Sequence, residues 1–294
     1  MKIVIGIPAY NEEKKIASII LKLKTISQNI IVCDDGSNDL TADIANELGA
    51  IVVKHEKNFG YGAAIKTIFL KSQEMKADIL VTFDADGQHR IEDIQKVIQP
   101  IKNNTADIVI GSRFLENSKN IPKYRKVGIK AITELTNIAS GTKISDSQSG
   151  FRAYNQKVLE KIKPIESGMG ISTEILIKAH KAGLQIAEVP IIVLYEGDSS
   201  THHPVSHGSS VIFSTLKYVA IERPLTFYGI PGVIFLGLGL FFGVWAMKIF
   251  SEQGEIITNI AIVGVGGVIL GTVLMITATI LHSIVSVIRE KNHP

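Results

Sequence analysis

The sequence has few cysteines and little excess charge of either sign, and each shortage excludes a class of protein. Cys33 is the single cysteine among 294 residues, which excludes an intrachain disulfide framework and a zinc module built on several cysteines. Basic residues number 31 and acidic residues 28, and a formal net charge of +3 is too small to indicate a nucleic-acid partner. Charged residues make up 20% of the chain and become scarce after Arg223, so an apolar C-terminal part follows a more polar one.

Two long apolar runs near the C-terminus predict a pair of membrane-spanning helices. The first, Phe227–Met247, contains no charged residue and has the length of about 20 residues that a bilayer core requires. The second, Ile256–Ile288, is uncharged apart from His282 and is longer than one span needs, so part of it is expected to be tilted or interfacial. The polar turn Ser251–Glu255 separates the runs. The alternative is a hairpin buried in a soluble protein, which would need more protein to cover it than this chain offers.

Basic residues beside the apolar runs predict their orientation. Arg223 precedes the first run, Arg289 and Lys291 follow the second, and the turn carries glutamates with Lys248 nearby. By the positive-inside rule, both termini are expected in the cytoplasm and only the turn across the cell membrane. The apolar stretch Ile3–Ile7 is too short for a signal peptide. The expected parts are a cytoplasmic domain over 1–200, a juxtamembrane segment over 201–225 and two transmembrane helices over 226–294.

Residues 209–222 predict a further contact with the membrane. Their apolar side chains fall on or near one face of a helix, which is typical of an interfacial amphipathic helix. An ordinary helix packed on a protein core would show the same pattern. The residues on that face are Val211, Ile212, Leu216, Val219 and Ala220.

Short apolar runs rich in β-branched residues alternate with helical patterns between Lys2 and Ile110. This alternation predicts an α/β fold, with a Rossmann-like, mostly parallel sheet that carries helices on both faces. Strands are expected over Lys2–Ile7, Asn29–Cys33, Ala50–Val53, Asp78–Phe83 and Asp107–Ile110, with helices after Asn11 and over Thr41–Leu48, Gly62–Lys71 and Ile91–Ile101.

Polar clusters follow four of the expected strands. In sheets of this kind, ligands bind beyond the carboxyl ends of the strands. Loops that are distant in the chain are therefore expected to line one crevice. These clusters are Pro8–Glu12, Asp34–Ser37, Asp84–Gln88 and Gly111–Arg113.

One of these clusters has the composition of a metal site. Asp84 and Asp86 flank a single residue directly after an apolar strand, and Gly87 lets the backbone turn. Two carboxylates at this spacing can share a divalent cation, and Gln88 adds a neutral oxygen. Oxygen ligands of this kind suit Mg²⁺ or Mn²⁺. The same three residues without a cation would form an ordinary solvated turn.

The remaining clusters have structural as well as functional interpretations. Asp34 and Asp35 can bind a nucleobase or ribose, or they can form a capping turn before the next helix. Asn11 can cap the helix that follows it. Gly60 and Gly62 lie in a loop with neither a Walker nor a GxGxxG pattern, and we expect them to allow a close backbone approach near a nucleotide.

Five motifs occur in order along the chain: PAYNE, DDGS, DADGQ, GSRF and DSQSGFRAY, followed by the two apolar runs. In this combination the sequence resembles the family-two inverting glycosyltransferases of GT-A fold, and among them the dolichol-phosphate mannose synthase-like polyprenyl-phosphate glycosyltransferases. The motifs cover Lys2 to about Tyr154. The resemblance implies transfer of a hexose, with inversion and with Mg²⁺ or Mn²⁺, from a nucleotide-sugar to dolichyl or another polyprenyl phosphate.

The resemblance also implies roles for single residues at the nucleoside. Pro8, Tyr10 and Glu12 match the positions that hold it, and Asp35, with Asp34 beside it, matches the carboxylate that receives the base or ribose. The donor is open between GDP-mannose and a UDP-hexose such as UDP-glucose or UDP-N-acetylglucosamine.

Further matches concern the metal and the phosphates. Asp84, Asp86 and Gln88 match the metal-binding triplet, and Asp86 is expected to be catalytic with two arginines. Arg113 matches an arginine near the phosphates, and Arg125 falls where relatives often have a second arginine for the acceptor phosphate.

Two other regions bear on the substrates. Gln148 and Ser149 match the loop that closes on the donor sugar. Relatives carry a basic residue after the last strand of the domain that contacts the diphosphate, and His203 is the candidate for that role here. The chain has no QxxRW motif, which favours a single transfer over polymerisation.

The acceptor decides whether a general base is needed. A phosphate monoester is largely dianionic at neutral pH because its second pKa is about 6, so it needs cations rather than a strong base. Glu174 lies in a helical pattern over Ile171–Ala182, where we expect a solvated or capping residue rather than a base. Two alternatives stay open: a membrane-tethered transferase that acts on a lipid-linked or protein hydroxyl, and a non-catalytic scaffold that binds a lipid-linked sugar.

Overall fold

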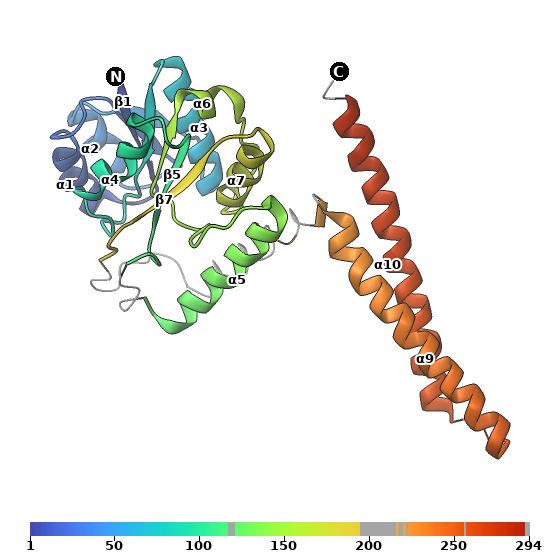
Figure 1. The fold of residues 1–294 in the computed structure, drawn as a ribbon. Coiled ribbons are helices and arrows are strands. Elements are labelled where there is room, and N and C mark those ends of the chain that lie inside the picture. Colours follow the sequence, from blue (N-terminus) through green and yellow to red (C-terminus); the bar gives the residue numbers. More distant parts are fainter. Residues whose placement is uncertain (117–120, 195–215, 217–219, 222, 256, 292–294) are drawn as a thin grey trace. The chain divides into compact units, whose positions relative to one another are not determined.

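The computed structural model describes residues 1–116, 121–194, 216, 220–221, 223–255 and 257–291. The chain forms two compact units that divide between Thr215 and Leu216. The first unit holds a seven-stranded sheet with its helices, and the second holds a pair of long helices (Figure 1). The interfacial helix predicted over 209–222 lies largely outside the described residues, and so does His203.

The sheet of the first unit is mixed, with the strand order β3-β2-β1-β4-β6-β5-β7. β6 runs antiparallel to both of its neighbours, β4 and β5, whereas the other neighbouring pairs are parallel. The strands are β1 (Ile3–Ala9), β2 (Ile30–Asp34), β3 (Ile51–Lys54), β4 (Ile79–Thr82), β5 (Ile108–Ser112), β6 (Arg152–Asn155) and β7 (Ile186–Pro190).

Helices cover both faces of this sheet (Figure 1). One face packs against α1, α2 and α4, and the other packs against α3, α6 and α7, while α5 contacts α7. The helices are α1 (Glu13–Leu23), α2 (Thr41–Glu47), α3 (Tyr61–Glu74), α4 (Asp93–Lys102), α5 (Lys123–Ser140), α6 (Gln156–Lys161) and α7 (Ile171–Lys181).

Side chains of the central strands alternate between these two cores. In β2, Ile30 and Val32 belong to the core shared with α1, and Ile31 and Cys33 belong to the core shared with α3. All four are almost completely buried. A strand covered on both faces is apolar at every position, which is why the central strands read as continuous hydrophobic runs.

The predicted α/β fold with a mostly parallel sheet is confirmed, and the structure adds one antiparallel strand, β6. The five strands expected between Lys2 and Ile110 correspond to β1–β5. β6 was not predicted, because its sequence, RAYN, is not a β-branched run. β7 was not predicted either. The reversed β6 inserts between β4 and β5, so the ends of those two strands are not adjacent.

The second unit contains the two apolar runs as long helices. α9 covers Ile230–Gln253, preceded by the π-helical turn η2 (Leu225–Gly229), and α10 covers Thr258–Lys291. The helical segments long and apolar enough to span a membrane are Leu225–Gln253 and Thr258–Val287, each largely unburied within the structure. Part of the predicted polar turn therefore belongs to α9, which ends at the left-handed Gly254.

Glycines bring α9 and α10 into close contact. A Cβ at Gly239 would lie 2.3 Å from the Val268 nitrogen, and one at Gly271 would lie 2.5 Å from the Leu236 nitrogen. Small residues at helix contacts allow this approach in membranes, where packing replaces the hydrophobic effect as the force between helices. Large side chains such as Phe241 and Met247 point outward instead.

Candidate active site

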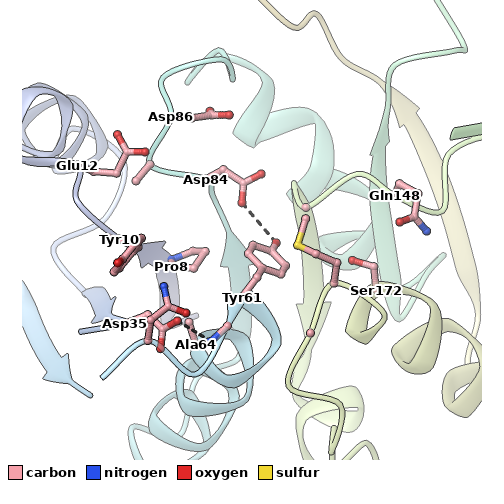
Figure 2. Close-up of a pocket in the computed structure, with 17 residues that line it drawn as sticks. Pro8, Tyr10, Glu12, Asp35, Tyr61, Ala64, Asp84, Asp86, Gln148 and Ser172 are labelled. Atoms are coloured by element: carbon pink, nitrogen blue, oxygen red, sulfur yellow. Dashed lines mark hydrogen bonds between the residues drawn. The ribbon is translucent and has the colours of Figure 1, made fainter. Parts of the chain in front are cut away.

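A pocket of about 540 Å³ opens at the carboxyl ends of β1, β2 and β4 (Figure 2). Asp35 lies at one end of it and Asp86 at the other, with Pro8 and Tyr10 between them (Figure 2). The convergence predicted for the loops after three strands is therefore present. The polar and aromatic lining residues are Tyr10, Glu12, Asp35, Asn58, Tyr61, Asp84, Asp86, Gln148 and Ser172.

The β2 end of the pocket is built around Asp35, whose carboxylate is only 5% exposed. Its Oδ1 accepts hydrogen bonds from His55 Nδ1 at 2.6 Å and from the Phe59 N–H at 3.0 Å. Its Oδ2 accepts from the Gly60 N–H at 2.8 Å. The loop after β3 therefore fixes the orientation of this carboxylate before any ligand binds.

Two glycines allow the loops at this end to approach one another. Gly36 has φ +75°, and a Cβ there would lie 2.4 Å from the Lys57 carbonyl carbon. A Cβ at Gly62 would lie 2.5 Å from the Glu166 carbonyl oxygen. Gly60 likewise faces the backbone of Ser167. The close approach expected at Gly60 and Gly62 is thus made by this chain's own segment 166–168.

Asp34 and Asn11 have partners within the protein. Asp34 is fully buried, accepts from the Ser37 N–H and hydroxyl, and is not among the pocket-lining residues. Asn11 does not cap α1 with its side chain, which instead accepts from the Asn38 N–H at 2.9 Å. Both residues therefore shape the turn after β2, and the capping interpretation of Asn11 is wrong.

The β4 end of the pocket is built around Asp84. The Tyr61 hydroxyl donates to its Oδ1 at 3.3 Å, and His89 Nε2 lies 3.3 Å from its Oδ2. Burial, followed by the charge of Asp84, raises the pKa of the Tyr61 phenol, which keeps this hydroxyl a donor. Asp84 is therefore held from two sides, and neither partner was identified from the sequence.

The surroundings of Asp86 and Glu12 disfavour a charged carboxylate. Burial and then the neighbouring charge of Asp84 raise the pKa of Asp86. Burial also raises the pKa of Glu12 to about 7, although the charge of Lys15 opposes this. The Lys15 ammonium donates to the backbone carbonyl of Asp86 at 2.9 Å. This end of the pocket thus concentrates carboxyl groups whose charged forms are disfavoured.

The loop before β6 completes the pocket on its other side. A Cβ at Gly150 would lie 2.6 Å from both Asp84 Oδ2 and the Tyr61 hydroxyl, so any side chain there would displace one of them. Arg152, at 1% exposure, donates to the backbone carbonyls of Ser147, Ser149 and Ser172. This buried guanidinium ties the loop that carries Gln148 to the start of α7.

Arg113 follows β5 and is paired with an acidic residue. Its Nε and Nη2 donate to Asp146 at 2.6 and 2.7 Å, and its backbone N–H donates to the same carboxylate. Glu188 of β7 accepts from the Ser145 and Asp146 N–H groups, which fixes the loop that carries Asp146. Arg113 is absent from the pocket lining because the reversed β6 separates β5 from β4.

The remaining predicted site residues lie outside the pocket lining. Gln88 contributes its backbone N–H to Asp86 Oδ1, Ser149 is buried, and Arg125 lies in α5, partly exposed. Glu174 is not solvated as expected. It is fully buried, accepts from the Ile165 and Glu166 N–H groups, and pairs with Lys178.

An α/β sheet with a pocket at its carboxyl edge defines a class of protein that binds its ligands at that edge. The particular family is shown by a model named glycosyl transferase family 2, which matches residues 4–163. The chain belongs to this family, and the resemblance inferred from its five motifs is confirmed.

Two relatives are similar over most of the chain. The UDP-N-acetylglucosamine–dolichyl-phosphate N-acetylglucosaminyltransferase of Methanococcus voltae is 40% identical over 228 residues, which covers 70% of this chain and 89% of that protein. The dolichyl-phosphate hexose transferase of Haloferax volcanii is 32% identical over 216 residues, which covers 73% of this chain and 92% of that protein.

A solved structure shares the fold at lower sequence similarity. Glucosyl-3-phosphoglycerate synthase from Mycobacterium tuberculosis, in complex with Mn²⁺, uridine diphosphate and glucosyl-3-phosphoglycerate, matches with a TM-score of 0.59 and 22% identity. The match covers 74% of this chain and 80% of that one. It supports the GT-A-like arrangement of the sheet.

Proposed function

We propose that this chain transfers a hexose from a nucleotide-sugar to a polyprenyl phosphate such as dolichyl phosphate, with inversion at the anomeric carbon. The observation that carries the proposal is the pocket, in which Asp35 and the Asp84–Asp86 pair lie at opposite ends. The names of the two relatives, both dolichyl-phosphate sugar transferases, support the same acceptor.

The β4 end fits a divalent cation. Asp84 and Asp86 both line the pocket, and burial followed by the charge of Asp84 raises the pKa of Asp86. A cation between the two carboxylates would offset both causes, because it favours their charged forms. Among the described residues no cluster of three His, Cys, Asp or Glu could hold a metal. Two carboxylates are what Mg²⁺ or Mn²⁺ uses when substrate phosphates complete its shell. When bound, such an ion supplies positive charge for a departing diphosphate.

The chain's own residues orient the two substrates. Asp35 receives the nucleoside, and Gln148 and Ser172 face it across the pocket (Figure 2). Arg113 is proposed to bind the acceptor phosphate, because a guanidinium can donate to phosphate oxygens in a planar fork. The Asp146 carboxylate holds one edge of that guanidinium and so fixes its plane. A dianionic phosphate needs no further base.

The hydrocarbon of the acceptor requires contact with a bilayer. The two apolar helices are long enough to span one, and the relatives act on lipid phosphates. We propose that the chain is a multi-pass membrane protein with both termini in the cytoplasm, since the basic flanks of the helices favour that orientation.

The test uses the full chain purified in detergent, with polyprenyl phosphate, Mg²⁺ or Mn²⁺, and labelled UDP- and GDP-sugars. The expected product is an acid-labile glycosyl phosphodiester, and its formation should stop when EDTA removes the metal. An acid-stable glycoside would indicate a hydroxyl acceptor instead. Metal-dependent nucleotide binding without any product would indicate a scaffold.

A further inference from the structure

The Asp35 carboxylate has most of its hydrogen-bonding capacity occupied by the protein. The two oxygens of a carboxylate together offer about four acceptor positions. His55 Nδ1–H and the Phe59 N–H occupy Oδ1, and the Gly60 N–H occupies Oδ2. About one position, on Oδ2, is therefore left for a ligand in the pocket.

His55 is held in place from several directions. Its Nε2 lies 2.9 Å from the Thr67 hydroxyl, and its backbone N–H donates to the Asp34 carbonyl at 2.9 Å. Its ring packs edge-on against Phe59 at 5.6 Å between centroids, and the side chain is 13% exposed. The ring cannot turn away from Asp35 without losing these contacts, so a ligand meets the carboxylate with its Oδ1 already occupied.

We propose that this arrangement makes the pocket select uridine over guanosine nucleotides, and that His55 is the positioning residue that sets the preference. Uracil presents one N–H, at N3, between two carbonyl oxygens. Guanine presents two adjacent donors, N1–H and the N2 amine. The inference rests on the proposed function, because it takes Asp35 as the carboxylate that receives the base of the donor.

The preference follows from the number of donors that Asp35 can still accept. Two parallel donors pair best with both oxygens of a free carboxylate. With one position left, the second donor of guanine would be buried without a partner, which costs a factor of roughly 10 to 100 in affinity. Uracil leaves no such donor. Asn58 also lines the pocket, and its side-chain amide can donate to a uracil carbonyl.

The first experiment needs no substitution. The full chain in detergent with Mn²⁺ is titrated with UDP, GDP and N3-methyl-UDP, and the dissociation constants are compared. We expect UDP to bind at least tenfold more tightly than GDP, and methylation of N3 to weaken binding at least tenfold. Equal or tighter binding of GDP would overturn the inference. So would unchanged binding of N3-methyl-UDP, because Asp35 would then be receiving a ribose hydroxyl instead.

The second experiment tests His55 itself. His55→Phe keeps a ring against Phe59 but removes one of the two protein donors to Asp35 Oδ1, so this oxygen is no longer fully occupied by the protein. The ratio of GDP to UDP affinity is expected to rise about tenfold, a change that a purely structural defect would not produce. Thr67→Val is the matched control, since it removes one of the two partners of the other ring nitrogen, the second being Cys33 Sγ, and should leave the ratio unchanged. A ratio unaffected by His55→Phe would refute the role of this residue.

The outcomes separate this inference from the proposed function. Glycolipid formed from GDP-sugars with tight GDP binding would support the function and overturn the inference. Preferential UDP binding with no glycolipid from any donor would support the inference and contradict the proposed function.

Discussion

The two acidic ends of the pocket differ in how the protein treats a carboxylate. At the β2 end, Asp35 is buried and surrounded by three N–H donors. At the β4 end, Asp86 is placed beside Asp84, and burial and that charge raise its pKa. The orientation of the first carboxylate is fixed by hydrogen bonds, whereas the charged form of the second is disfavoured. One pocket thus combines a preorganised carboxylate with the carboxylate pair at which we propose a cation.

The largest effect is expected from removing the carboxylate of Asp86, a proposed ligand of the cation. Asp86→Asn should lower the rate of sugar transfer on the order of a thousandfold, as the loss of a main electrostatic contact does. The unfolding temperature in EDTA should stay the same or rise, because the substitution also removes the repulsion from Asp84. Transfer assays and thermal unfolding of the same sample check both parts. Unchanged turnover would remove Asp86 from the metal site.

The geometry around Asp84 can be tested with a single methyl group. Gly150→Ala would place its Cβ 2.6 Å from Asp84 Oδ2 and from the Tyr61 hydroxyl, forcing one of them to move. We expect transfer to fall about 100-fold, since displacements near 1 Å cost that much. Gly128→Ala in α5 is the control, because nothing lies within 4 Å of its Cβ. Equal activity of the two variants would contradict the packing described here.

The rigidity of the β2 end predicts a loss of stability. Gly36→Ala combines φ +75° with a Cβ 2.4 Å from the Lys57 carbonyl carbon. The free energy of unfolding should fall by at least ~2 kcal/mol, from the left-handed backbone and the overlap together. Gly183→Ala shares a positive φ of +68° but has nothing within 4 Å. Its smaller loss, about 1 kcal/mol, isolates the backbone contribution.

The smallest expected effect concerns pH. Burial raises the pKa of Glu12 from 4.5 to about 7 in the folded chain. Between these values the folded state binds more protons than the unfolded state, so stability falls as the pH rises from about 4.5 to 7.

Glu12→Gln should remove this fall, which is on the order of 1 kcal/mol for a half-buried group. Thermal unfolding in EDTA across that pH range measures it, with the exposed Glu56→Gln as a control that keeps the slope. An identical slope in wild type and Glu12→Gln would show that another group is responsible.

The sequence predicted those parts of the fold that depend on local pattern. The apolar strands β1, β2 and β4 and the polar residues at their ends were identified, since a strand covered on both faces has a distinct composition. β6 was missed because its buried Arg152 is stabilised by backbone carbonyls of the loop before it and of Ser172 in α7, which meet only in the folded chain. No local pattern reveals such partners.

Contacts between distant parts of the chain also explain which pocket residues were missed. Asp35, Asp84 and Asp86 were identified as acidic residues at strand ends, and the structure places all three in the lining. His55 and Tyr61 act through side chains that meet these carboxylates only after the sheet has formed. Arg113 was expected to share the crevice because it follows a strand, but no local pattern showed that β6 lies between β5 and β4.

The reversed strand has a consequence for redesign. Because β6 runs antiparallel to β4 and β5, the segment between α5 and β6 enters the sheet from the edge at which the parallel strands end. Any exchange of residues 141–151 between homologous chains would have to keep Gly150, which faces Asp84, and Asp146, which pairs with Arg113. Exchange of the remaining positions changes one wall of the pocket, beside Gln148, and leaves Asp35 and Asp84 at the ends of their strands.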